Sequence, residues 1–421
     1  MKRALLALVI LIGIAIALVV WRSDGDTAIP PATVTAFDDP QLIERGAYLA
    51  RVGHCAGCHT AQGGSPYAGG YGVLTPFGTV YASNLTPDPE TGLGEWTSDD
   101  FWRALHNGRS KDGRFLYPAF PYPNYTQVTR GDADALFAYL RSLPPVKQPN
   151  HAHTLRFPYS TQAALGVWRA LYFEPGVYEP VASQPAEWNR GAYLVKGLGH
   201  CSACHASRNA LGASHETLDG GPMPVQGWYA PSLLSKREAS VAHWEPSRIV
   251  ALLRDGVTPG ASTIGPMAEV VYGSTQHYKE ADLQAVAAYL AALPAEDDPA
   301  PEAEAVSKAR WARGERVYSE RCADCHGESG EGVRGMYPAL AGNRAITMDD
   351  PTNVVSAVLR GGFAPTTAGN PRPFGMPPYA TLLNDEDIAA VVSYIRNAWG
   401  NRASAVTAWE VQRHGRGVGT R

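Results

Sequence analysis

All six cysteines of this chain occur in one repeated pattern, and they are the residues with the clearest chemistry. The segments GHCAGCHT (53–60), GHCSACHA (199–206) and RCADCHGE (321–328) each contain two cysteines separated by two residues and followed at once by a histidine. Two cysteines at this spacing project from the same side of one helical turn. Such a pair can form a disulfide, bind a metal or attach a cofactor covalently.

The first two of these chemistries fit the pattern poorly. A disulfide framework has no use for a histidine beside every pair. A zinc site would bring two pairs together and leave the third without a partner. A thioredoxin-like redox pair needs a βαβ setting, which the sequence does not show. The motifs therefore predict c-type haem attachment through thioethers from Cys55, Cys58, Cys201, Cys204, Cys322 and Cys325.

The histidine of each motif is predicted to be the proximal iron ligand. It follows the second cysteine directly, so that attachment of the porphyrin holds the imidazole against the iron. These ligands are His59, His205 and His326. Three motifs predict three covalently bound haem c groups per chain.

Each motif lies in a repeated frame of helices. An Arg-Gly pair and a short helix precede the motif, as in RGAYLARVGHCAGCH (45–59), RGAYLVKGLGHCSACH (190–205) and RGERVYSERCADCH (313–326). An amphipathic helix with leading acidic residues closes each repeat: DADALFAYLRSLPP (132–145), EADLQAVAAYLAALP (280–294) and NDEDIAAVVSYIRNAWG (384–400). This layout resembles a class I cytochrome c domain.

The chain is therefore predicted to be all-α, with three tandem class I cytochrome c domains, long ordered loops and an N-terminal membrane helix. The connection between the first two domains includes the aromatic stretch 154–176, which either packs between domains or docks on a partner or the membrane. The predicted boundaries are 1–26 for the anchor or signal, 37–150, 185–294 and 306–400 for the domains, 151–184 for the aromatic connection, 295–305 for an acidic Pro/Ala linker and 401–421 for an exposed tail.

The N-terminus carries an apolar run from Ala4 to Trp21, preceded by Lys2 and Arg3. The run is just long enough to span a bilayer, and no small-x-small cleavage site follows it. This favours an uncleaved anchor over a cleaved signal or a buried helix. The leading positive charge predicts that the rest lies on the periplasmic face of the bacterial inner membrane. Signal cleavage, giving a secreted periplasmic protein, is the alternative.

Composition argues against other classes of function. The formal net charge is −4 and no basic stripe is present, which gives no reason to expect nucleic-acid binding. No Ser-His-Asp set, Walker loop or dinucleotide fingerprint is evident. Apolar residues make up 45% and charged residues 18% of the chain, as in a packed globular protein.

Outside the motifs, the sequence resembles the three-haem cytochrome c subunit of bacterial membrane-bound dehydrogenases of the alcohol, gluconate, sorbitol and fructose types. Similar subunits serve molybdenum hydroxylases. The resemblance runs from about residue 37 to 400 and is carried by SNLTPDPETGLGEW (83–96), DGRFLYPAFPYPNYT (112–126), the stretch 188–213, GWYAPSL (227–233), GPMAEVVYGSTQ (265–276) and GMPPYATLLNDEDI (375–388).

The resemblance implies a non-catalytic electron-transfer subunit bound to a larger catalytic subunit of the flavin, quinone or molybdenum type. Such a subunit passes electrons to ubiquinone or to a downstream cytochrome or oxidase. Two other interpretations remain open. One is a peroxidase-like haem enzyme that uses an open first haem, and the other is a cytochrome module of a terminal oxidase.

Methionine is the usual axial ligand opposite the histidine. Met267 in GPMAEV and Met376 in FGMPPY precede the closing helices of the second and third repeats, and both resemble the axial methionines of the family. Met223 and Met336 lie in the earlier loops after the motifs, where core packing is more usual, and Met348 precedes a helix. Met223 and Met336 are the alternative axial ligands, with core packing as the more usual role of a methionine in such a loop, and Met348 favours a structural role more strongly still.

The first repeat has no methionine between its motif and Asn150, and Phe120 in YPAFPY stands where many relatives have methionine. The first haem is then open, holds water or takes a ligand from elsewhere. His106 in RALHNG is the candidate within the repeat, with a solvent-facing helix residue as the alternative. Weaker candidates are His54, His151 and His153.

Overall fold

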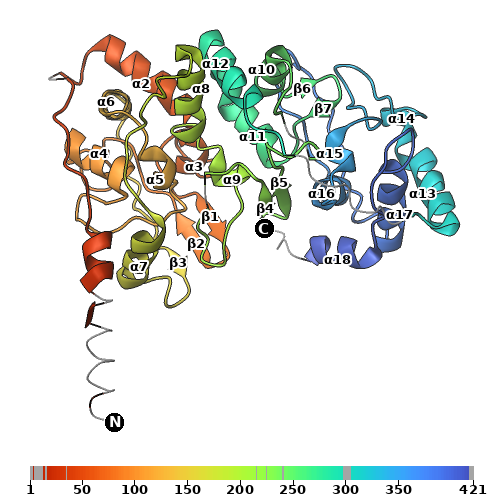
Figure 1. The fold of residues 1–421 in the computed structure, drawn as a ribbon, viewed down its shortest axis with the longest axis horizontal. Helices are drawn as coiled ribbons and strands as arrows, with labels where there is room; N and C mark the ends of the chain where they lie inside the picture. Colours follow the sequence, from red (N-terminus) through yellow and green to blue (C-terminus); the bar gives the residue numbers. More distant parts are fainter. Residues whose placement is uncertain are drawn as a thin grey trace. The chain divides into compact units, whose positions relative to one another are not determined.

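Short helices joined by long loops make up most of the chain (Figure 1). The computed structural model describes residues 3, 13–14, 17–34, 36–214, 216–223, 225–238, 241–296 and 305–416. The chain divides into two compact units. The first comprises the chain up to Val181 with Tyr193–His200 and Asn209–Ala213, and the second comprises Ala182–Ala192, Cys201–Arg208 and the chain from Ser214 onward.

The first unit contains the first repeat. Its elements are α2 (Pro40–Val52), α3 (Cys55–His59), β1 (Gly72–Thr75), β2 (Gly78–Tyr81), α4 (Ser98–Asn107), α5 (Tyr122–Tyr125), α6 (Arg130–Arg141), β3 (Thr154–Leu155) and α7 (Gln162–Tyr172). The three strands form an antiparallel sheet in the order β1-β2-β3, with Gly72 opposite Tyr81 and Thr79 opposite Thr154. Helix α8 (Ala186–Lys196) contributes to both units.

The second unit contains the rest of the second repeat and the third. Its elements are α9 (Ser202–His205), β4 (Gly221–Met223), β5 (Trp228–Ala230), α10 (Pro246–Asp255), β6 (Val257–Thr258), β7 (Ala261–Ser262), α11 (Pro266–Gly273), the 3-10 helix η1 (Thr275–His277), α12 (Glu280–Ala291), α13 (Lys308–Arg321), α14 (Ala323–His326), α15 (Arg344–Thr347), α16 (Thr352–Arg360), α17 (Asp385–Ile395) and α18 (Ala408–Arg416). Strands β4 and β5 form one antiparallel pair and β6 and β7 another.

The mostly helical fold confirms the predicted class, but the short strands were not predicted. The longest have four residues and no helical or alternating pattern marks them in the sequence. The predicted division into three domains stays a prediction. The structure divides into two compact units, of which the first contains one closing helix and the second contains the other two.

The Arg-Gly pair of each repeat marks the point where the first helix crosses the closing helix. A Cβ on this glycine would lie 1.9, 1.9 and 2.2 Å from a carbonyl oxygen of the closing helix, in the pairs Gly46 with Ala135, Gly191 with Ala285 and Gly314 with Ala390. No side chain fits at such distances, so only glycine lets the two backbones approach this closely. The recurrence of glycine in the sequence therefore has a packing cause.

The arginine before each glycine pairs with an aspartate in the first turn of the closing helix. The distances from Nε to the carboxylate are 3.0, 2.8 and 2.7 Å, in the pairs Arg45–Asp132, Arg190–Asp282 and Arg313–Asp387. The aspartate also complements the positive end of the helix dipole. One glycine contact and one ion pair thus fix the same helix crossing in all three repeats.

The C-terminal segment is packed, so the predicted exposed tail over 401–421 is wrong as far as residue 416. Val406 and Val411 are fully buried and belong to the core of the third repeat. The backbone N–H of Val406 donates to Ser393 Oγ at 2.8 Å. Val411 is the one buried residue in the described part of α18, while Trp409 is 64% exposed, so the apolar residues of the sequence do not reveal how this helix packs. Residues 417–421 lie outside the described part.

The predicted membrane helix over Ala4–Trp21 falls largely outside the described residues, of which 17–23 are helical. Among the residues that the structure describes, no helix combines the length and the hydropathy needed to cross a bilayer. The predicted acidic linker at 295–305 also lies mostly outside the described residues.

Within the second unit, one asparagine joins the second repeat to the third. Asn353 of α16 donates Nδ2 to the carbonyl oxygen of Tyr229 at 2.8 Å, and its Oδ1 accepts from the N–H of Tyr229 at 2.9 Å. One turn later, Ser356 Oγ donates to the carbonyl of Gly227 at 2.6 Å. The side-chain amide of Asn353 therefore forms a pair of hydrogen bonds with the main chain of β5, as the backbone of a neighbouring strand would.

Candidate haem-attachment sites

Each C-x-x-C-H motif folds into a single helical turn that follows a longer helix: α3 after α2, α9 after α8 and α14 after α13. His54 and His200, which precede the first cysteine in two motifs, adopt left-handed φ values of 52° and 37°. Gly57 leaves room for this bend, because a Cβ there would lie 2.1 Å from Nε2 of His54. In the first two motifs the backbone therefore bends just before the first cysteine.

The motif histidine has the same hydrogen bond in all three repeats. Its Nδ1 lies 2.7, 2.7 and 3.0 Å from a backbone carbonyl oxygen in the following loop, in the pairs His59–Ser83, His205–Pro231 and His326–Pro338. A histidine whose Nδ1–H donates to a carbonyl keeps its lone pair on Nε2, the arrangement found in metal-ligating histidines. The sequence predicted these histidines but not their acceptors, because a backbone carbonyl leaves no residue signature.

Burial favours the neutral form of the motif histidines and of the first cysteine in each motif. Desolvation lowers the pKa of all three motif histidines, which favours the neutral imidazole that ligates metals. Burial, with a smaller contribution from the second thiol, raises the pKa of Cys55 and Cys201 to about 12 and that of Cys322 to about 11. These thiols are therefore protonated at neutral pH.

These residues fit a covalently bound haem c. None of the six cysteines is in a disulfide. Within the described part of the chain, no group of three or more His, Cys, Asp and Glu side chains is arranged to hold a metal ion. Each motif offers two thiols for thioether bonds and one oriented imidazole for the iron. When bound, haem supplies an iron centre that takes up and releases one electron.

Met376 packs on the same core as the third motif. Met376 and Cys322 both contact the buried cluster formed by α13, α16 and α17. Two backbone hydrogen bonds with Gly362, of 2.8 and 3.0 Å, hold the methionine loop. Three residues later, Tyr379 donates Oη to the carbonyl of Arg321 at 2.8 Å, directly before Cys322. The sequence did not single out this tyrosine. Iron coordination by Met376 stays a prediction.

Met267 lies in the first turn of α11, and the loop that leads into this helix packs against β5. A Cβ on Gly265 would lie 2.7 Å from the ring of Trp228 in that strand. The paired strand β4 follows Gly220, whose N–H donates to the carbonyl of His205 at 2.7 Å. The strand pair therefore connects the Met267 loop with the second motif, and coordination by Met267 also stays a prediction.

The other three methionines differ in burial. Met348 is fully buried in the core, which agrees with a structural role. Met223 is partly buried in β4. Met336 is 42% exposed, so the predicted packing role is wrong for this residue.

Phe120 lies in a chain of aromatic contacts that leads to the first motif. Its ring centre is 5.2 Å from that of Tyr125, which in turn is 5.6 Å from that of His200. Nε2 of His200 is 3.4 Å from the carbonyl oxygen of Gly53, two residues before Cys55. Phenylalanine has no donor atom for iron, so this position cannot supply a sixth ligand.

His106 is buried at the end of α4, which corrects the alternative of a solvent-facing residue. Its Nδ1 lies 2.7 Å from the carbonyl oxygen of Thr126, and its ring stacks on Trp102 with centres 4.6 Å apart. Burial lowers the pKa of His106. The hydrogen bond matches that of the motif histidines, but these contacts join His106 to Trp102 and Thr126 rather than to the motif turn. Ligation by His106 stays a prediction.

The weaker histidine candidates have other partners. Nδ1 of His153 accepts from the N–H of Tyr81 at 3.1 Å, and the ring of His151 lies 5.5 Å from that of Tyr81. The imidazole of His54 packs over Gly57 within the motif. These contacts place His151 and His153 beside the end of β2.

Comparison with known proteins gives consistent matches. The Cytochrome c family model matches residues 43–144 and 311–399. The chain is 39% identical over 395 residues to the cytochrome c subunit of the quinone alcohol dehydrogenase of Gluconobacter oxydans (strain 621H), covering 89% of this chain and 82% of the relative. It is 38% identical over 391 residues to the gluconate 2-dehydrogenase cytochrome c subunit of Pantoea cypripedii, covering 88% of each. It is 33% identical over 395 residues to the fructose dehydrogenase cytochrome subunit of Gluconobacter japonicus, covering 87% and 81%.

The motif turns, the oriented histidines and the helix crossings define a c-type cytochrome. With the matches over most of its length, the chain belongs to the family of cytochrome c subunits of dehydrogenase complexes. Members of this family carry covalently bound haem c and transfer electrons.

Proposed function

We propose that this chain binds three haem c groups, one on each motif, and conducts electrons from a larger dehydrogenase subunit to ubiquinone or another respiratory acceptor. The observation that supports this proposal is the common geometry of His59, His205 and His326, each with Nδ1 on a loop carbonyl. The second motif lies outside the residues that the family model matches. Its turn and its helix crossing nevertheless repeat those of the other two.

The partner follows from the relatives, which are the cytochrome subunits of alcohol, gluconate and fructose dehydrogenases. By this similarity, the electron donor is a separate catalytic subunit that contains a flavin, quinone or molybdenum cofactor. The chain sits on the periplasmic face of the inner membrane, and the apolar run Ala4–Trp21 anchors it there.

The three haems differ in their axial ligands. Met267 and Met376 complete the second and third irons, and methionine ligation favours a high potential. The first haem has no methionine, and His106 is its candidate ligand. A histidine ligand would give the first haem a lower potential, whereas an open iron would leave it accessible to small molecules.

The intact mass of the full chain, matured in a host that attaches haem c, tests the haem count. We expect three haem additions, and the double variant Cys201→Ala/Cys204→Ala should lose one of them. Two additions in the fully matured parent would overturn the count.

Co-purification tests the partner. A tagged chain from solubilised membranes should yield a larger dehydrogenase subunit, and the substrate of that subunit should reduce the haems only when both proteins are present. Reduction by an alcohol or sugar with this chain alone would contradict the electron-transfer role. Peroxide turnover by the purified chain would instead favour the peroxidase-like alternative, which the phenylalanine at position 120 suggests.

A further inference from the structure

We infer that the outer face of helix α7, together with Phe157 before it and Trp21 beside it, is a second membrane contact that lays the first unit on a lipid surface. This inference rests on the proposed location of the chain at a bilayer. It goes beyond anchoring, because it concerns the folded haem unit itself and determines which side of that unit faces the lipid.

Helix α7 has the reverse of the usual arrangement of charge and apolar residues. Its sequence is QAALGVWRALY, and its one charged residue, Arg169, is only 2% exposed. The stripe that faces solvent consists of Ala163, Val167 and Leu171 at four-residue spacing, and Val167 and Leu171 are 44% and 58% exposed. A surface helix of a soluble protein places its charges outward and its apolar stripe inward. An apolar outer face instead indicates a surface that meets an apolar partner.

The buried side of α7 is held by cation–aromatic contacts. The guanidinium of Arg169 lies 4.8 Å from the ring centre of Phe115 and 4.7 Å from that of Phe173. It also donates to the carbonyl of Asn107. These contacts explain why the charge points inward, and they leave the apolar stripe on the outside.

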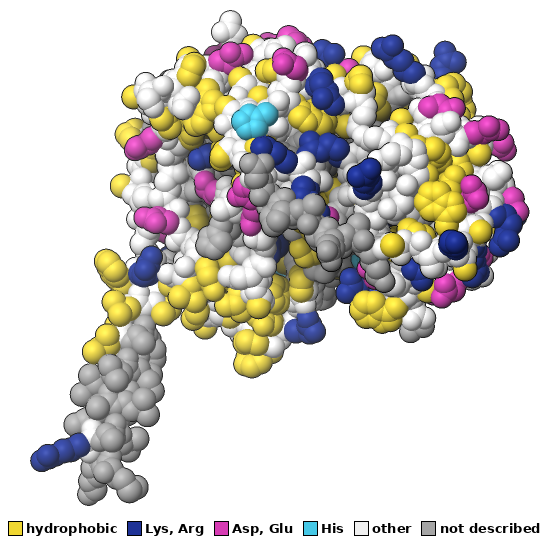
Figure 2. Space-filling model, turned by 45° about the vertical axis from the view of Figure 1, so that its right-hand side comes forward, with side chains coloured by type: hydrophobic (Ala, Val, Ile, Leu, Met, Phe, Trp, Pro, Cys, Tyr) yellow, Lys and Arg dark blue, Asp and Glu magenta, His cyan; other side chains and the backbone are white. Residues whose placement is uncertain are grey.

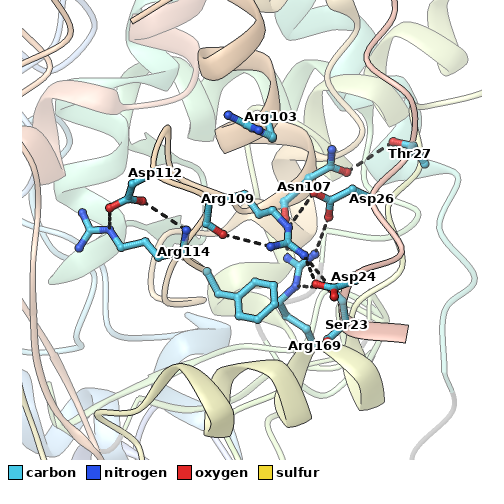
Figure 3. A network of polar contacts seen from close by, with 12 residues as sticks. Ser23, Asp24, Asp26, Thr27, Arg103, Asn107, Arg109, Asp112, Arg114 and Arg169 are labelled. Carbon is cyan, nitrogen blue, oxygen red and sulfur yellow. Dashed lines mark hydrogen bonds and ion pairs between the residues drawn. The ribbon is translucent and has the colours of Figure 1, made fainter. Parts of the chain in front are cut away.

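The end of the N-terminal helix is fastened to this same helix (Figure 3). Arg169 donates Nε to the carbonyl of Ser23 at 3.4 Å and pairs with Asp26 at 3.3 Å. Arg109 pairs with Asp24 at 2.6 Å and with Asp26 at 2.7 Å. The chain that leaves the apolar run therefore enters the folded unit directly beside α7.

The two apolar elements consequently lie at one end of the first unit. Helical residues 17–23 and α7 are side by side there (Figure 1), and hydrophobic side chains gather on the lower surface of the molecule in the view of Figure 2. Trp21 is 72% exposed and Phe157, in the loop between β3 and α7, is 84% exposed. The apolar run, which is long enough to span a bilayer, thus ends beside the apolar face of the first unit. We expect this face to lie on the bilayer surface.

The residues at the edge of this surface match the bilayer interface. Trp21 is followed by Arg22, and Phe157 is preceded by Arg156, and both arginines are exposed. Aromatic rings with adjacent basic residues are typical of the headgroup region, where the ring inserts and the charge meets anionic lipid. This pairing, and the attachment to the apolar run, favour lipid over a protein as the occupant of the surface.

Photo-crosslinking of the full-length, haem-loaded chain tests this contact. The chain is reconstituted into vesicles of phosphatidylcholine and phosphatidylglycerol that contain a phosphatidylcholine with a diazirine in its acyl chain. After irradiation, tryptic peptides are analysed for lipid adducts. We expect adducts on the peptides that contain Phe157, Val167 and Leu171, several-fold above the peptide around Leu382. Leu382 is a suitable reference because it is 66% exposed but lies in the third repeat.

A variant distinguishes lipid insertion from chance contact. Val167→Glu/Leu171→Glu changes only exposed positions and should lower the adducts on α7 several-fold, while Leu382→Glu should leave them unchanged. Adducts confined to the N-terminal peptide would overturn the α7 contact and leave the anchor intact. Adducts on α7 without any on the N-terminal peptide would support the contact and overturn the anchor. Equal labelling of the Leu382 peptide, or no adducts at all, would overturn the inference.

Discussion

The glycine at each helix crossing gives the sharpest test of the fold, and Gly46→Ala is the substitution of choice. The added Cβ would lie 1.9 Å from the carbonyl oxygen of Ala135, whereas Cβ atoms do not approach other atoms closer than 3.0 Å. Helices α2 and α6 must therefore part by about 1.1 Å, or their side chains must shift. Overpacking of this kind costs about 1–3 kcal/mol.

Gly131→Ala is the matched control. Gly131 also lies in a helix of the first unit, but a Cβ there would meet only Thr33, at an ordinary distance of 3.6 Å. Alanine in a helix is favoured over glycine by about 1 kcal/mol. We therefore expect Gly131→Ala to be neutral or stabilising, and the two variants to differ by about 2 kcal/mol or more.

Native-state hydrogen exchange measures this difference. The slowest amides of α2 and α6 should exchange more than tenfold faster in Gly46→Ala than in Gly131→Ala, since about 1.4 kcal/mol corresponds to a factor of ten. Amides of α13 and α17 serve as an internal reference, because they form the crossing of the third repeat. Equal protection of α2 and α6 in the two variants would refute the close-approach explanation for the Arg-Gly repeat.

Three further experiments address the ligands, a buried histidine and the N-terminal attachment. Met267→Ala and Met376→Ala should each remove one methionine–iron charge-transfer band from the ferric spectrum, and an unchanged spectrum would reject that ligand. Burial lowers the pKa of His200 from its ordinary 6.5 to about 4. Between these two pH values the folded state binds fewer protons than the unfolded state. The free energy of unfolding should therefore be highest above about pH 6.5 and should fall as the pH drops toward 4. His200→Gln should flatten this acid slope, which denaturation at several pH values would show. Arg169→Met should release the segment that follows the N-terminal helix and speed its tryptic removal several-fold, while the exposed Arg114→Met should not.

The chemistry of the chain could be predicted from its sequence because attachment of haem c requires particular side chains at fixed spacing. The three motifs are visible for this reason, and the Arg-Gly pairs are visible because they recur before each motif. The purpose of the repeated glycine was not, since a helix crossing joins residues about ninety positions apart, as Gly46 and Ala135 are.

Features that depend on backbone atoms or on isolated contacts were not predictable. The carbonyl acceptors of the motif histidines belong to Ser83, Pro231 and Pro338, and a bond to a main-chain oxygen does not require any one residue type. A single histidine at the end of a helix has no periodic partner, so the sequence does not show that His106 is buried against Trp102. The packing of the tail is not evident from the sequence, because its buried apolar residues, Ala403, Val406 and Val411, are separated by polar or partly exposed ones.

The paired hydrogen bonds from Asn353 to Tyr229 affect how freely this chain can vary in evolution. Both bonds go to main-chain atoms of Tyr229, so the side chains of β5 can change without breaking them. Position 353, in contrast, must present a donor and an acceptor in one plane, which an amide supplies and a carboxylate does not. Aspartate there would set an unprotonated oxygen against the carbonyl of Tyr229. We therefore expect relatives that keep this connection to vary in β5 while retaining an amide at position 353.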